Sequence, residues 1–455
     1  MTERLLIIGG NAAGMSCASQ VRRLRDAADL EIEVVEAGQW TSYSSCGIPY
    51  WVGGEVEDAD ALIARSPADF AAMDIGILLG SRAESIDLAA ATVAVSPADR
   101  CSDGGDQTTT LTYDRLLIAT GSVPLRPPVD GLDAVGVFGA QTIPDADAIR
   151  RALDNKPRRA VVLGGGYIGL EMAEALVNQG LSVTVVLADP FPMGSLDEDM
   201  GERVCAAMTA MGIDVRTCEP VRGIDVEAGL ARAVVTDEGS YPADLVVLGL
   251  GVRPNSDLAR DAGLRIGTTK GIEVDDTMHT PTHENVYAAG DCIQTRNRIT
   301  GHPVAIALGT HANRQGRVAG TNIGGRPARF EGVLGTAVTK VGNCEIGRTG
   351  LSTMDAELAG YSIETTLLES TVKAGYYPEA GKLAVKLLTE RQTQRILGGQ
   401  IVGGPGSAKR IDVLATAIWA QLTAAEFAAV DISYAPPFSP VFDAVVLAAR
   451  KAAGR

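Results

Sequence analysis

Cys46 is the residue of this chain whose surroundings point most directly to chemistry. It lies in the segment Ser42-Tyr-Ser-Ser-Cys-Gly-Ile-Pro49, and no second cysteine stands within a few residues of it. A redox cysteine without a neighbouring cysteine must pair with something from outside, namely a small thiol, a sulfur atom or an oxygen atom. The alternative is an inert buried cysteine, which is a common role for this residue type.

The residues after Cys46 predict the start of a helix, because Pro49 is suited to a first helical turn. The dipole of such a helix would stabilise a thiolate at position 46. A thiolate is the species that attacks a disulfide. The segment therefore predicts thiol–disulfide chemistry.

A glycine turn precedes this segment and predicts a dinucleotide site. The apolar run Arg4–Ile8 reads as a buried strand, and it leads into Gly9-Gly-Asn-Ala-Ala-Gly14 and a helical stretch to about Ala28. Backbone N–H groups at such a helix start suit a pyrophosphate. Glu36 is spaced to accept hydrogen bonds from a ribose hydroxyl. Asn11 replaces the middle glycine of the motif, which makes this copy imperfect.

A second glycine turn, Gly164-Gly-Gly166-Tyr167-Ile-Gly169, has all its glycines. The preceding residues read as a strand, and a helix is expected over 170–179. The position that usually carries an acid is Leu187, although Asp189 follows closely. Because a carboxylate there favours NADH and an arginine favours NADPH, the choice between the two nucleotides stays open.

Two further apolar strands end in small or acidic residues that suit a flavin. One ends in Ala119-Thr120-Gly121, and the other ends in Ala289-Gly-Asp291, whose carboxylate could hold a ribityl chain. Each alone could be a core strand with a polar end. Together with two glycine turns they predict two dinucleotides, FAD and a hydride donor.

Composition excludes several other classes of protein. The 455 residues include 40 Lys plus Arg and 56 Asp plus Glu, a formal charge of −16, which argues against nucleic acid as a partner. No run approaches the roughly 20 apolar residues of a membrane span, and the apolar run at the start is too short for a secretory signal. With four histidines and no Cys/His cluster of metal-ligand spacing, we expect no metal site. We expect a cytoplasmic protein.

On these motifs the chain resembles the pyridine nucleotide-disulfide oxidoreductases, across essentially its full length. Within them it is similar to the branch with one redox cysteine, which includes coenzyme A disulfide reductases, NADH oxidases, NADH peroxidases and persulfide reductases. The motifs that carry the resemblance are both glycine turns, the second with Glu171, the Cys46 segment, Ala119–Gly121, Ala289–Asp291 and Tyr434-Ala-Pro-Pro-Phe-Ser439.

The resemblance implies an α/β fold with two Rossmann-like dinucleotide-binding domains and a C-terminal α+β dimerisation domain, and hence a homodimer. We expect the FAD-binding domain in two parts, 1–150 and 256–327, around an NAD(P)H-binding domain at 151–255, with the dimerisation domain at 328–455. In this last domain the pattern predicts strands at Gly332–Val341, Lys382–Thr389 and Ile396–Val402, and a helix near Asp412–Ala420.

The resemblance also discriminates between activities. Peroxidases and water-forming oxidases of the branch carry a histidine in the first glycine turn, where this chain has Ala12. The disulfide reductases use two tyrosines of the dimerisation domain, which match Tyr376 and Tyr434. A phenol can protonate a leaving thiolate, and Tyr434 would act on Cys46 of the partner subunit. The alternative is that both tyrosines only pack in an interface.

Coenzyme A is the less certain substrate. The resembling reductases bind it with residues that match Gln20 and Arg23, and we also expect substrate contacts from Ser42 and Ser45. A lysine that those reductases carry after the next helix is absent, although Arg65 could compensate.

The expected mechanism places NAD(P)H at the second turn, where Tyr167 moves aside and Glu171 holds the reacting side of the site. Electrons then pass through FAD to Cys46, which cleaves a small disulfide or persulfide. Two alternatives remain. One is an NAD(P)H oxidase that reduces oxygen, and the other is a ferredoxin reductase-like electron-transfer flavoprotein that does not need Cys46.

Overall fold

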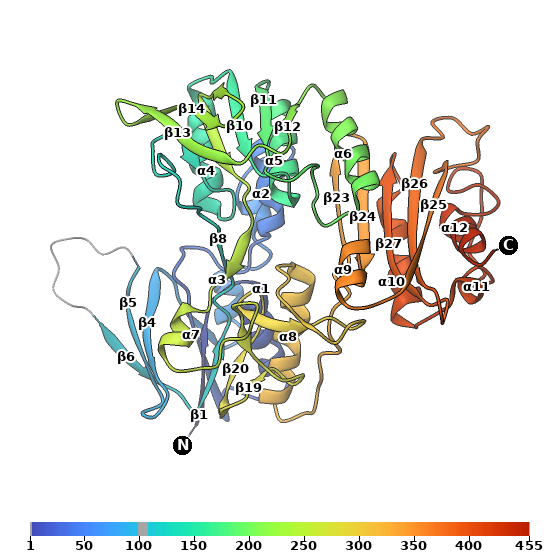
Figure 1. Ribbon diagram of the computed structural model, residues 1–455. Coiled ribbons are helices and arrows are strands. Elements are labelled where there is room, and N and C mark those ends of the chain that lie inside the picture. Colours follow the sequence, from blue (N-terminus) through green and yellow to red (C-terminus); the bar gives the residue numbers. More distant parts are fainter. Residues whose placement is uncertain (1, 99–107, 455) are drawn as a thin grey trace. The chain divides into compact units, whose positions relative to one another are not determined.

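The computed structural model describes residues 2–98 and 108–454, which form two compact units (Figure 1). The first unit contains the described residues of Met1–Ser45, Asp58–Leu125 and Val252–Val333. The second contains Cys46–Glu57, Arg126–Gly251 and those of Leu334–Arg455. Each unit is described by itself. Within the described residues, no helix is both long and apolar enough to cross a membrane.

A six-stranded sheet forms the centre of the first unit, in the order β19-β20-β7-β1-β2-β3. Its strands are β19 (His279–Thr280), β20 (His283–Ala288), β7 (Arg115–Ile118), β1 (Glu3–Ile8), β2 (Leu30–Val35) and β3 (Ile75–Leu78). All neighbours are parallel except β19 and β20. Strands β1, β3 and β7 are mainly apolar, as expected for a parallel sheet covered on both faces.

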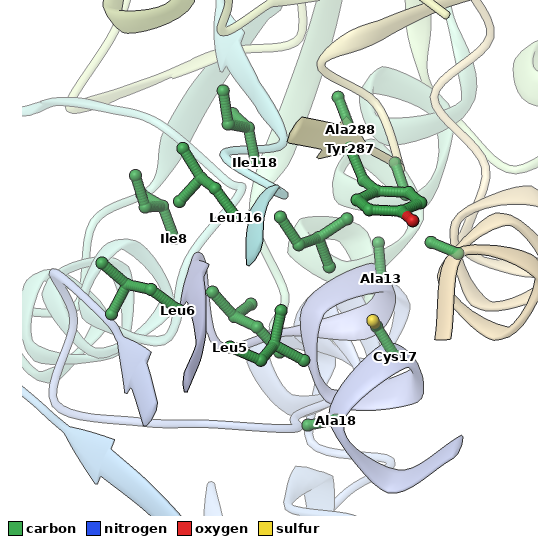
Figure 2. Close-up of a cluster of buried hydrophobic side chains, with 14 of the residues drawn as sticks. Leu5, Leu6, Ile8, Ala13, Cys17, Ala18, Leu116, Ile118, Tyr287 and Ala288 are labelled. Carbon is green, nitrogen blue, oxygen red and sulfur yellow. The ribbon is translucent and has the colours of Figure 1, made fainter. Parts of the chain in front are cut away.

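Helices α1 (Ala12–Arg22) and α8 (Gly309–Ile323) pack against each other in this unit. Figure 2 shows side chains of α1 beside those of β1, β7 and β20 in one buried cluster. The remaining elements are α3 (Pro67–Ala71), α7 (Asp257–Asp261), η2 (Asp60–Leu62), β4 (Ser81–Asp87), β5 (Thr92–Pro97), β6 (Thr109–Thr112), β8 (Ser122–Pro124), β17 (Val252–Pro254), β18 (Ile272–Glu273), β21 (Ile293–Arg296) and β22 (Pro303–Val304).

The first helix is shorter than the sequence predicts, because it ends at Arg22 and not near Ala28. The guanidinium of Arg22 donates to the carbonyl oxygens of Arg25 and Leu30, at 3.1 and 3.0 Å. These bonds hold the chain in a turn that leads into β2. A sequence pattern does not reveal such a stop, since it depends on one side chain reaching the following backbone.

The second unit contains a parallel sheet in the order β12-β11-β10-β16-β9. The strands are β12 (Asp214–Arg216), β11 (Ser182–Val186), β10 (Arg159–Leu163), β16 (Leu245–Leu248) and β9 (Val137–Phe138). Helix α5 (Tyr167–Asn178) follows the second glycine turn and includes most of the predicted helix at 170–179. The neighbouring elements are α2 (Ile48–Gly53), α4 (Ile143–Asp154), α6 (Glu198–Ala210), β13 (Val221–Glu227), β14 (Leu230–Thr236) and β15 (Ser240–Pro242).

An antiparallel sheet forms the C-terminal part of the second unit, in the order β23-β24-β27-β26-β25. Its strands are β23 (Ala337–Val341), β24 (Cys344–Gly350), β27 (Ile396–Gly403), β26 (Lys382–Glu390) and β25 (Ile363–Thr371). The helices of this part are α9 (Thr353–Leu358), η3 (Ala408–Arg410), α10 (Ile411–Trp419), α11 (Ala424–Phe427) and α12 (Ala444–Ala452). The predicted α/β class with two parallel sheets and a separate C-terminal α+β part is confirmed.

Candidate functional site

The first glycine turn closes so tightly that only glycine fits. Gly9 has φ +108°, and a Cβ there would lie 2.1 Å from the carbonyl oxygen of Ala119. A Cβ on Gly14 would lie 1.9 Å from the carbonyl oxygen of Gly9. Helix α1 begins at Ala12, and the side chain of Asn11 makes no capping hydrogen bond. The first N–H groups of α1 are therefore available to a pyrophosphate.

Glu36 follows β2 and lies directly beside this turn. One carboxylate oxygen accepts from the N–H of Gly10 at 2.7 Å, and the other accepts from the N–H of Gly38 at 2.6 Å. Each oxygen keeps a lone pair for a further donor. This geometry suits the predicted contact with the ribose of a dinucleotide.

Asp291 is a partly buried carboxylate that can accept from another donor. The hydroxyl of Ser122 donates to it at 3.2 Å, and burial raises the pKa of Asp291. Thr120 and Gly121 follow β7 in the same unit, and the hydroxyl of Thr120 donates to the carbonyl oxygen of Asn255 at 2.6 Å. A ribityl hydroxyl would satisfy the Asp291 carboxylate, so these residues fit FAD.

His311 is a buried residue of the first turn of α8 that sequence reasoning missed. Its Nδ1 has no hydrogen-bond partner among the described residues. Burial, together with the positive charge of Arg314, lowers the pKa of His311 to about 4. An unpartnered buried nitrogen marks a place where a ligand could supply the missing bond.

The second glycine turn repeats the steric pattern of the first and leaves an open face. Gly164 has φ +98°, and a Cβ on Gly169 would lie 2.1 Å from the carbonyl oxygen of Gly164. A Cβ on Gly166 would meet nothing within 4 Å, so this glycine borders open space. Leu187 is buried, and a Cβ at Gly165 would lie 3.1 Å from its Cδ1. No carboxylate is present at the end of β11 itself.

Tyr167 and Glu171 lie on the first turns of α5. Burial raises the pKa of each side chain. The hydroxyl of Thr339 donates to Glu171 at 2.8 Å. Glu171 is thus a partly buried carboxyl group whose pKa is raised by burial.

Cys46 is exposed in the 3-10 turn Ser45–Gly47 and is not part of a disulfide. The predicted helix start is confirmed, because α2 begins at Ile48 with Pro49 in its first turn. The alternative of a buried cysteine does not fit this exposure, and the reactivity of Cys46 remains a prediction. The phenol of Tyr50, one turn further on, lies within electrostatic reach of both Cys46 and Glu171.

Tyr376 and Tyr434 lie together, as a shared role requires. Their phenols are hydrogen-bonded to each other, and this bond raises the pKa of Tyr434. Both side chains are largely exposed, at 78% and 45%. Their catalytic role remains a prediction.

A cavity of about 370 Å³ in the first unit is rich in arginine. Arg23 of α1 lines it, and so does Arg65, which the sequence offered as a replacement for the missing lysine. Arg314 and Arg317 of α8 complete the set of four. The arginines of α8 were missed because they are far from Arg23 in sequence, and only the packing of α1 on α8 brings them together.

The other predicted substrate residues differ in their positions. Ser42 lines the cavity and has φ +51°. Ser45 is exposed in the turn that holds Cys46. The Gln20 amide donates to the hydroxyl of Thr321 at 3.1 Å, and Gln20 is not among the residues that line the cavity. No group of three or more His, Cys, Asp or Glu able to hold a metal occurs in the described part of the chain.

Comparisons with known proteins match nearly the whole chain to members of one family. The family model "Pyridine nucleotide-disulphide oxidoreductase" matches residues 3–316, and the model of the dimerisation domain of that family matches residues 336–446. An NAD(P)H coenzyme A polysulfide/persulfide reductase from Pyrococcus horikoshii is 39% identical over 452 residues, 99% of this chain and 98% of the relative. An NADH oxidase from Methanocaldococcus jannaschii is 37% identical over 456 residues, again 99% and 98% of the two chains.

Among solved structures, that of an NAD-dependent persulfide reductase from A. fulgidus superposes with a TM-score of 0.95. Its identity to this chain is 39%, and the match covers 99% of this chain and 83% of that one.

Proposed function

Because this chain belongs to the pyridine nucleotide-disulphide oxidoreductase family, we propose that it is an FAD-dependent NAD(P)H oxidoreductase that reduces the disulfide or persulfide of a low-molecular-weight thiol through Cys46. The observation that carries the proposal is the exposed Cys46 on a turn next to α2, in the same unit as the second glycine turn and Glu171. The relatives named for persulfide reduction support the choice of a sulfur substrate.

FAD would be held by the first glycine turn, Glu36 and Asp291, whose open hydrogen-bonding capacity fits a pyrophosphate, a ribose and a ribityl chain. When bound, a flavin accepts a hydride from NAD(P)H and passes two electrons to sulfur. NAD(P)H would bind at Gly164–Gly169, where the open face of Gly166 lets a phosphate approach the backbone.

The residues of this chain would then act as follows. Tyr167 stands at the start of α5 and would move aside for the nicotinamide. The carboxyl group of Glu171 would orient that ring. The thiolate of Cys46 attacks one sulfur of the substrate, so that a mixed disulfide forms and the first thiol leaves. Two electrons then reduce the mixed disulfide, which releases the second thiol and regenerates the Cys46 thiolate.

Coenzyme A is the thiol that the arginine-lined cavity favours. Coenzyme A carries a pyrophosphate and a 3′-phosphate, and guanidinium groups are suited to bind phosphate oxygens in pairs. Four arginines surround a volume large enough for part of such a molecule. The missing lysine is therefore no argument against coenzyme A, since Arg65, Arg314 and Arg317 supply positive charge.

Tyr376 and Tyr434 are proposed as the acid that protonates a leaving thiolate. The dimerisation domain makes a homodimer the expected assembly. In this arrangement Tyr434 would act on Cys46 of the partner subunit.

Anaerobic assays of NAD(P)H consumption test the function directly. We expect turnover with coenzyme A disulfide, coenzyme A persulfide or polysulfide, and loss of at least about 100-fold in Cys46→Ser, which removes the nucleophile. A protein that turns over only when oxygen is supplied would instead support the NADH oxidase alternative, which the M. jannaschii relative represents. Survival of electron transfer to a protein acceptor in Cys46→Ser would favour a ferredoxin reductase-like role.

A further inference from the structure

Two carboxylates on one face of α5 are contacted by adjacent residues of β23. Glu171 and Glu174 are three residues apart, so their side chains lie on the same side of the helix. The hydroxyl of Thr339 donates to Glu171 at 2.8 Å, and the ammonium of Lys340 lies 2.6 Å from Glu174. One carboxylate therefore faces a neutral donor, and the other faces a cation.

The partial burial of the Glu174–Lys340 ion pair strengthens the electrostatic effect of the Lys340 charge. The Glu174 side chain is 9% exposed, and that of Lys340 is 35% exposed. Burial acts to lower the pKa of Lys340, but the hydrogen bond and the charge of Glu174 outweigh it and raise the pKa. Lys340 is therefore charged; it forms an ion pair with Glu174, and its charge also acts on Glu171.

Tyr50 connects these groups to Cys46. The ammonium of Lys340 lies 6.0 Å from the centroid of the Tyr50 ring. Burial, followed by nearby negative charges that include Glu171 and Cys46, raises the pKa of Tyr50 to about 12. The Tyr50 phenol thus stays protonated, and the negative charges that act on it include Glu174 and Glu55 as well as Glu171 and Cys46.

Two further charged groups near the helix that follows Cys46 are Glu55, just after α2, and Arg150 of α4. Arg150 donates to the carbonyl oxygen of Trp51 at 2.7 Å and lies over the Trp51 ring, near the last turn of α2. Helix α2 is fixed against α5, because the Gln179 amide donates to the carbonyl oxygen of Gly53 at 2.9 Å. Arg150 therefore contacts the last turn of α2, and Lys340 is the cation that lies near Tyr50.

We propose that Lys340 is a positioning residue for the thiol chemistry of Cys46. By pairing with Glu174, it cancels one of the negative charges near the Cys46 turn and so favours the thiolate. Lys340 comes from the antiparallel sheet, so that sheet contributes to the reactivity of the thiol as well as to assembly. This inference rests on the proposed function only in that it takes Cys46 as the reactive thiol.

Alkylation of Cys46 measures this effect without any substrate. The FAD-loaded protein is reduced with a thiol, desalted and treated with iodoacetamide over a range of pH, and the rate at Cys46 is followed by peptide mass spectrometry. In Lys340→Met we expect the midpoint of the profile to move to higher pH and the rate at pH 7 to fall about fivefold, with the plateau at high pH unchanged. Lys340→Arg should retain the wild-type profile.

Glu174 supplies the matched variant. Glu174→Gln removes the negative charge and should move the midpoint to lower pH, and the double variant Lys340→Met/Glu174→Gln should return toward the wild-type midpoint. Lys451→Met is the control, because this lysine donates to the carbonyl oxygen of Leu367 and pairs with no carboxylate.

Two results would overturn the proposal. One is a Lys340→Met protein that melts like the wild type and has an unchanged alkylation profile, since the ion pair would then be only structural. The other is an unchanged profile in Glu174→Gln, which decides the matter even if Lys340→Met fails to fold. Because no disulfide is reduced in this experiment, its outcome is independent of whether the proposed substrate is correct.

Discussion

At the scale of single residues, the arginines of the cavity provide the sharpest test of coenzyme A. Arg314 lines the cavity, and its guanidinium also lies 5.8 Å from the centroid of the Phe330 ring. In Arg314→Met we expect KM for coenzyme A disulfide to rise about tenfold with kcat nearly unchanged, because the lost contact binds the ground state and the transition state equally.

A disulfide without phosphates serves as the internal control for this prediction. Its kinetic constants should be the same in Arg314→Met and in the wild type. Arg326→Met provides the matched variant, because Arg326 is exposed and does not line the cavity. Equal losses with both disulfides would mean that Arg314 supports the fold and not the substrate.

At the scale of elements, we expect the end of β11 to set the choice of nicotinamide nucleotide. Leu187 is buried there, but the next residue, Ala188, is exposed. We expect Ala188→Arg to raise the ratio of kcat/KM for NADPH over NADH by about tenfold, because a guanidinium binds a 2′-phosphate. Ala188→Asp should shift the ratio in the opposite direction, since a carboxylate repels that phosphate and accepts from a free ribose hydroxyl.

The two variants control each other, because a general loss of activity leaves the ratio unchanged. A shift in the same direction for both, or no shift in either, would mean that the ribose of the nucleotide does not lie at this strand end.

The elements also show what the sequence can and cannot predict. The glycine turns, the strands around them and the helix start after Cys46 follow from local residue types, and the structure has each of them. The end of α1 at Arg22, the cavity arginines of α8 and the Lys340–Glu174 pair depend on contacts between distant segments. No local pattern encodes those contacts, so these parts required the structure.

At the scale of the whole molecule, a buried ion pair joins the antiparallel sheet of the second unit to the start of helix α6. Lys386 of β26 lies 2.8 Å from Asp197 and 2.7 Å from Asp199, and the Lys386 and Asp197 side chains are 11% and 8% exposed. We expect Lys386→Met to lower the free energy of unfolding at pH 7 by about 3 kcal/mol, because it leaves a buried carboxylate unpaired. The exposed pair of Lys409 with Asp412 is the control, and Lys409→Met should cost less than about 0.5 kcal/mol.

The same pair has a defined pH dependence. Burial alone would raise the pKa of Asp197, but its hydrogen bonds with Lys386 and Thr353 hold the pKa below the ordinary carboxyl value. The stabilisation is therefore present above the ordinary carboxyl pKa and is lost as the pH falls through the folded value. Denaturant titrations at several pH values should show the wild type and Lys386→Met converging in acid. A constant difference between them would contradict this account.

The proposed homodimer leads to the last prediction, which concerns whether its two subunits share each active site. The exposed large side chains in the C-terminal part of the second unit include some that would suit a surface for a second copy: Tyr376, Tyr434, Phe438, Val441 and Phe442. If Tyr434 serves Cys46 of the partner subunit, Cys46→Ser and Tyr434→Phe homodimers should each lose most activity, because each of their sites lacks one group. A hybrid dimer of the two variants contains one site with both groups intact. Mixing the two proteins under conditions that exchange subunits should therefore restore roughly a quarter of wild-type activity, since half of the dimers become hybrids and half of their sites are intact.

Native mass spectrometry would verify that hybrids form. Hybrids without recovered activity would place Tyr434 and Cys46 of each site on the same subunit, and full activity in Tyr434→Phe alone would remove this tyrosine from the mechanism.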